Sequence, residues 1–100
     1  MDEEELKRAG EELFKIGQLT MEGRHLSKIT RTYFGDAWGF YRHLEDIKSM
    51  KTCTGLLRQT GLDKEEIILY QNAGFRSATR AIEACESDKK IFDENDFFGF

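Results

Sequence analysis

Apolar side chains recur every three or four residues along most of the chain, which places them on one face of an α-helix. The clearest stripe lies within residues 2–17, where Leu6, Leu13 and Phe14 alternate with charged positions. Similar stripes predict further helices over about residues 25–34, 37–51, 63–73 and 77–86, and a short helix or turn over about residues 54–59. We therefore expect an all-α fold, a compact orthogonal bundle of five or six short helices.

Glycines and acidic residues set the expected helix boundaries. Gly35 and Gly74 each follow an apolar stripe, where glycine commonly ends a helix in a left-handed turn. Asp36 then predicts the N-cap of the next helix. Asp63 and Glu66 have the three-residue spacing of a capping box, which predicts a helix start there.

The helical pattern stops after Ser87. Residues 88–100 contain five apolar side chains interleaved with acids, in neither a helical nor an alternating period. We expect one helical domain over residues 1–87 and an acidic, aromatic C-terminal tail over residues 88–100.

Composition narrows the class of protein. A chain of 100 residues with 34% charged residues is typical of one globular domain. No apolar run has the length of a membrane span, and the acidic start is unlike a signal peptide. Cys53 and Cys85 have no metal-binding or redox spacing, so we expect free thiols in the cytoplasm.

The net charge of −4 is unevenly distributed. Residues 1–12 hold six acids against two bases, whereas residues 23–62 hold seven bases against three acids. The basic middle is a candidate for contact with phosphate, or a solvated helix surface with no partner. The candidate nucleic-acid-binding residues of this middle are Arg24, Lys28, Arg31 and Arg42.

Residues 66–81 have the pattern of a helix-turn-helix, with Gly74 in the turn and Phe75 between the two helices. The string Gly-Phe-Arg-Ser at 74–77 is similar to the turn of the winged helix-turn-helix in LexA-type repressors, although Tyr70 stands where that family prefers Ala. The resemblance implies DNA contact at the start of a second helix. Its candidate residues are Arg76, Ser77, Thr79 and Arg80.

A second window over residues 29–44 has the same pattern, with Gly35 near its turn. Its ending, Phe-Tyr-Arg-His-Leu at 40–44, is similar to the recognition helices of small bacterial regulators. The window is rich in aromatic residues. Beside Arg31 and Arg42 these rings suit base stacking, whereas the alternative interpretation places them in the core.

The C-terminal tail also allows two interpretations. It resembles the C-terminal peptides of single-stranded-DNA-binding proteins and of phage polymerases that bind sliding clamps. That resemblance implies docking on a partner protein, with phenylalanines in pockets and acids at a basic rim. The candidate partner-binding residues are Ile91, Phe92, Asp93, Asp96, Phe97, Phe98 and Phe100. Alternatively, the phenylalanines fold back and complete the core.

Catalytic chemistry has little support, because His25 and His43 are the only histidines and neither has a carboxylate at a useful spacing. We expect no enzyme activity, cofactor or metal. The favoured hypothesis is a small DNA-transaction regulator of the phage or plasmid type. The alternative is an acidic inhibitor or adaptor that blocks a nucleic-acid-handling host protein without touching DNA.

Overall fold

Four α-helices form the fold in our computed structural model, which describes the backbone of residues 1–23 and 28–97 and the side chains of residues 1–23 and 28–87. The helices are α1 (Glu3–Glu22), α2 (Lys28–His43), α3 (Ile47–Gln59) and α4 (Lys64–Phe97). The expected all-helical class is confirmed over the described residues, but the expectation of five or six short helices is wrong.

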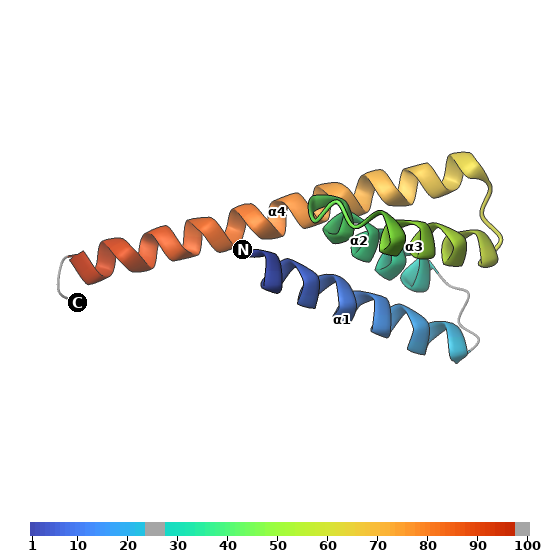
Figure 1. Cartoon of the computed structure of the whole chain (residues 1–100), viewed down its shortest axis with the longest axis horizontal. Helices are drawn as coiled ribbons and strands as arrows, with labels where there is room; N and C mark the ends of the chain where they lie inside the picture. The colour runs from blue at the N-terminus through green and yellow to red at the C-terminus, as the bar shows by residue number, and fades with distance from the viewer. Residues whose placement is uncertain (24–27, 98–100) are drawn as a thin grey trace.

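Helix α2 is the centre of the molecule, and each of the other three helices packs against it. Figure 1 shows α1 and α4 on either side of the α2–α3 pair. Contacts join Gly35 to Tyr70 and Gly39 to Gly74, so α2 and α4 run side by side in the same direction. This pair is therefore aligned rather than orthogonal.

The helix starts are fixed by side-chain caps. The Asp2 carboxylate accepts a hydrogen bond of 2.8 Å from the Glu5 backbone N–H at the start of α1. At the start of α4, the Glu66 N–H donates to Asp63 at 2.9 Å and the Asp63 N–H donates to Glu66 at 3.2 Å. The predicted capping box is confirmed.

The glycines expected to end helices lie inside them instead. Gly35 is in the middle of α2, and Gly74 is in the middle of α4. A Cβ on Gly35 would lie 2.6 Å from the carbonyl oxygen of Tyr70, and a Cβ on Gly74 would overlap the carbonyl oxygen of Gly35. These glycines let two helix backbones touch, and neither makes a turn.

Both helix-turn-helix interpretations are therefore wrong. Residues 66–81 lie within α4, and residues 29–43 lie within α2 with Leu44 directly after its end, so neither window contains a turn between two helices. Asp36 is an interior residue of α2 and not an N-cap. The break after α2 comes at residues 44–46, where Asp46 caps α3 by accepting from the Ser49 N–H.

Two glycines of α1 receive aromatic rings from α2. A Cβ on Gly10 would lie 3.1 Å from the Tyr41 ring, and one on Gly17 would lie 2.8 Å from the Phe34 ring. At these two glycines, the predicted apolar stripe of α1 leaves space that the large rings of α2 fill. The buried core residues of α2, α3, the α3–α4 turn and the start of α4 include Phe34, Ala37, Tyr41, Cys53, Leu57, Leu62 and Ile67.

The apolar run at residues 67–70 predicts a central, buried helix, and this expectation is only partly met. Ile67 is 3% exposed, but Ile68 is 42% exposed and Leu69 is 67% exposed. Helix α4 packs on α2 through one face, because α2 already occupies the centre.

The chain continues as helix beyond the expected end near Glu86. Helix α4 reaches Phe97, so the backbone of residues 88–97 is helical rather than irregular. Figure 1 shows the C-terminal half of α4 extending well past the other three helices. The described chain is accordingly elongated, with extents of 54 × 26 × 20 Å.

Both cysteines are free thiols, as expected, but their surroundings differ. Cys53 is 0% exposed, and burial together with the nearby Asp46 carboxylate raises its pKa to about 12. Cys85 is exposed on α4. We expect a thiol-reactive dye to label Cys85 at neutral pH and to label Cys53 only on unfolding. Mass spectrometry of peptides from native and denatured chain measures this, and fast native labelling of Cys53 would contradict the packing of α3.

Candidate functional site

The residues expected to start a DNA-reading helix lie instead near the middle of α4. Arg76, Ser77 and Arg80 are exposed there. Thr79 faces α2, with its hydroxyl oxygen 2.9 Å from Nε2 of His43. Of the four predicted residues, Thr79 therefore contacts the C-terminal end of α2.

Arg42 lies at this junction against two aromatic rings. Its guanidinium carbon is 5.9 Å from the centroid of the Trp38 ring and 5.4 Å from that of Phe75. The His43 and Phe75 rings stack at 4.7 Å with 12° between their planes. Such contacts hold a cation by attraction to the ring face. We call this set the arginine–aromatic surface; it comprises Trp38, Arg42, His43, Phe75, Arg76, Thr79 and Arg80.

Hydrogen bonding fixes the ring of His43. The Thr79 hydroxyl donates to the carbonyl oxygen of Phe75 at 2.8 Å, which uses its single proton. Its 2.9 Å contact with His43 must therefore be a bond that the Nε2–H donates. Stacking and hydrogen bonding together hold His43 and Phe75 rigidly beneath Arg42.

The rest of the predicted basic middle does not join this surface. The guanidinium of Arg31 is held within the fold by two hydrogen bonds to Thr60. Its Nη2 donates to the Thr60 carbonyl oxygen at 2.6 Å, and its Nε donates to the Thr60 hydroxyl oxygen at 3.2 Å. Lys28 is exposed at the opposite, N-terminal end of α2. Arg24 lies outside the described residues.

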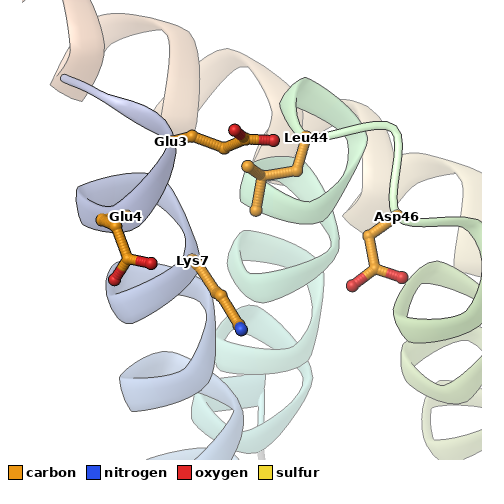
Figure 2. A pocket seen from close by; sticks show the side chains of 5 residues that line it. All are labelled: Glu3, Glu4, Lys7, Leu44 and Asp46. Carbon is orange, nitrogen blue, oxygen red and sulfur yellow. The ribbon is translucent and has the colours of Figure 1, made fainter.

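A second surface, an acidic pocket of about 330 Å³, lies where α1 begins and α2 ends. Figure 2 shows its lining, with Glu3, Glu4 and Lys7 on α1 and Leu44 and Asp46 on the α2–α3 turn. Hydrogen bonds from Ser49 lower the pKa of Asp46. The pocket therefore has a negatively charged wall at neutral pH, which suits a cationic group.

The two surfaces occupy one end of the bundle. Arg42 and His43 are the last residues of α2, and Leu44 and Asp46 of the acidic pocket follow them directly. Helix α4 passes this end beside His43 and continues beyond it. Opposite charges and a projecting helix are thus concentrated there.

Sequence reasoning placed Phe75 between the two helices of a helix-turn-helix, and it did not assign His43 to a binding surface. The spacing offered one signal, because Phe75 and Thr79 are four residues apart and share a helix face. The candidate partner-binding side chains from Ile91 to Phe100 lie outside the described side chains.

Among the described residues, no three metal-ligating side chains cluster. In the same part of the chain, no helix has the length and apolar character needed to cross a membrane. Comparison with protein-family models, curated proteins and solved structures finds no match. The fold and its surfaces define a small helical domain with one charged end.

Proposed function

We propose that this chain is a small, non-catalytic binding protein that docks on a protein partner through the projecting part of α4. The observation that carries the proposal is the continuation of α4 past the bundle, where no other described helix packs on it. A helix of 34 residues commonly gains its stability from packing along its length. The unpacked part is therefore suited to a partner.

Charge supports the same interpretation. The sequence after residue 87 holds four acids and two lysines, and α1 begins with three exposed glutamates at the same end of the bundle. An acidic end favours a partner with a basic site, in the manner of an inhibitor or adaptor. A nucleic-acid-handling protein of the host offers such a site.

A DNA-transaction regulator is the second candidate, and it now depends on a different feature. Neither predicted window contains a turn between helices, so the arginines named in them do not lie at the start of a second helix. What favours nucleic acid is the contact of Arg42 with the Trp38 and Phe75 rings, together with exposed Arg76 and Arg80, which follow Phe75 along α4.

Cross-linking from Cys85 tests the docking proposal directly. Cys85 is exposed on the projecting side of α4, so a thiol-reactive photocrosslinker attached there will lie at the proposed interface. The candidate partners are basic nucleic-acid-handling proteins. After the labelled chain is irradiated in the presence of such a protein, we expect mass spectrometry to detect one discrete covalent adduct. Deletion of residues 88–100 should abolish the adduct and leave the bundle folded by circular dichroism.

The matched control moves the crosslinker to the opposite end of the bundle. In a Cys85→Ser chain, Gln59→Cys places an exposed thiol at the end of α3. Equal adducts from both positions, or an adduct that survives deletion of residues 88–100, would refute docking through α4.

A further inference from the structure

We infer that the arginine–aromatic surface binds a short stretch of single-stranded nucleic acid, with a base stacked on the outer face of Arg42. The proposal concerns a surface separate from the projecting part of α4, and it stands whether or not a protein partner docks there. Its basis is the geometry of Arg42, the spacing of two further arginines and the charges beyond them.

Arg42 is an exposed, planar cation with its position already fixed. Trp38 and Phe75 lie within 5.9 Å and 5.4 Å of its guanidinium carbon, and Phe75 is itself held by stacking on His43. Because Arg42 is exposed, its planar guanidinium is open to a nucleobase from solvent, and stacking on the guanidinium plane is a common way for arginine to bind unpaired bases. Little side-chain freedom remains to be lost on binding.

Arg76 and Arg80 supply charge beside this stacking position. Both are exposed on α4, four residues apart, so they lie on neighbouring turns of one face. That separation is comparable with the distance between successive phosphates of a flexible strand. The three arginines therefore match one stacked base and the two phosphates that flank it.

The charges farther along α4 favour a single strand over a duplex. Exposed Glu83 lies seven residues after Arg76, and exposed Glu86 lies seven after Thr79, so both acids share the face of the surface two turns later. A rigid duplex laid along α4 would bring its phosphates against these carboxylates. A single strand bends away from them, and its unpaired bases remain free to stack.

The test uses the fluorescence of Trp38, which is the single tryptophan of the chain and belongs to the surface. The probe is an oligothymidylate of about eight nucleotides, titrated into the intact protein at about 50 mM and about 200 mM salt. We expect saturable quenching that weakens with salt, with a log–log slope near −1.4 for about two phosphate contacts. A duplex of equal length should bind at least about fivefold more weakly.

Substitutions separate stacking from charge. Arg42→Ala should weaken binding about tenfold, and Arg42→Lys, which keeps the charge but loses the plane, should still weaken it about fivefold. Arg58→Ala removes an exposed arginine from the end of α3 and should leave affinity unchanged. Circular dichroism confirms that each variant is folded.

Four results would overturn the inference. They are the absence of quenching at the lower salt, a duplex that binds as tightly as the single strand, full affinity in Arg42→Lys, and equal competition by inorganic phosphate at the same concentration of phosphate groups. None of them bears on the Cys85 adduct, so failure of this proposal is distinguishable from failure of docking through α4.

Discussion

Replacing Gly74 with alanine is expected to lower the free energy of unfolding by at least about 3 kcal/mol, because overpacking at a rigid backbone contact cannot relax cheaply. The new Cβ would overlap the carbonyl oxygen of Gly35, which is main chain and held within α2. Relief requires α2 and α4 to separate, which would also open the packing of Ala78 on the same face. Urea denaturation followed by circular dichroism measures the change.

Gly55 provides the matched control, since it is also an interior helix residue but a Cβ there would meet nothing within 4 Å. Gly55→Ala should stabilise the domain by about 0.5–1 kcal/mol, because alanine loses less backbone entropy than glycine in a helix. A Gly74→Ala chain as stable as the wild type would show that the two backbones do not touch. Destabilisation by both substitutions would instead indicate a general intolerance of change in these helices.

Replacing Asp36 with asparagine is expected to stabilise the protein at neutral pH. Asp36 is half-buried within α2, and burial raises its pKa from 3.8 to about 6. In the described part of the chain no neighbouring cation offsets that cost. The folded state therefore holds the proton more tightly than the unfolded state does, and ionisation at pH 7 costs up to about 3 kcal/mol of stability.

The sign of the pH dependence follows from this raised pKa. The contribution of Asp36 to stability is complete below pH 3.8 and is lost as the pH rises to about 6. The stability difference between Asp36→Asn and wild type should therefore grow across this range and level off above it. Glu12→Gln, an exposed substitution on α1, controls for the change in net charge. A difference independent of pH would show that Asp36 is solvated.

The parts of the fold that depend on local chemistry were predictable from the sequence. Asp2 and the pair Asp63 and Glu66 cap helices because their side chains reach backbone N–H groups three residues away. The buried glycines of α1 also lie on the predicted stripe. Such features involve only residues that are close in sequence, so the spacing of residues along the chain is enough to predict them.

The errors arose where a residue acts across the fold. Gly35 and Gly74 have the local signature of helix ends, and only the approach of α2 to α4 shows that each makes room for the other backbone. One pattern indicates this function in retrospect, because Gly35 and Gly39 are four residues apart, as are Gly74 and Ala78. Small residues at that spacing form a flat strip on a helix.

The candidate site was predictable by residue but not by arrangement. Arg42, Arg76, Thr79 and Arg80 were all named from the sequence, yet as members of two separate windows. Arg42 contacts Phe75 and His43 bonds to Thr79 because α2 and α4 run side by side in the same direction, a consequence of the intervening α3. The direction and pairing of helices are tertiary properties, so residue spacing within either window cannot predict them.

The glycine contact between α2 and α4 also gives the molecule a mechanical property. Helix α4 is held at Gly74 and Ala78 and continues as one helix to Phe97, about 28 Å farther at 1.5 Å per residue. A change in the angle between α2 and α4 at this contact therefore moves the whole C-terminal part of α4. A tilt of about 10° there would carry the far end about 5 Å, over the length given by the helical rise. A small rearrangement around Gly35 and Gly39 is therefore converted into a displacement comparable to one turn of helix at the tip.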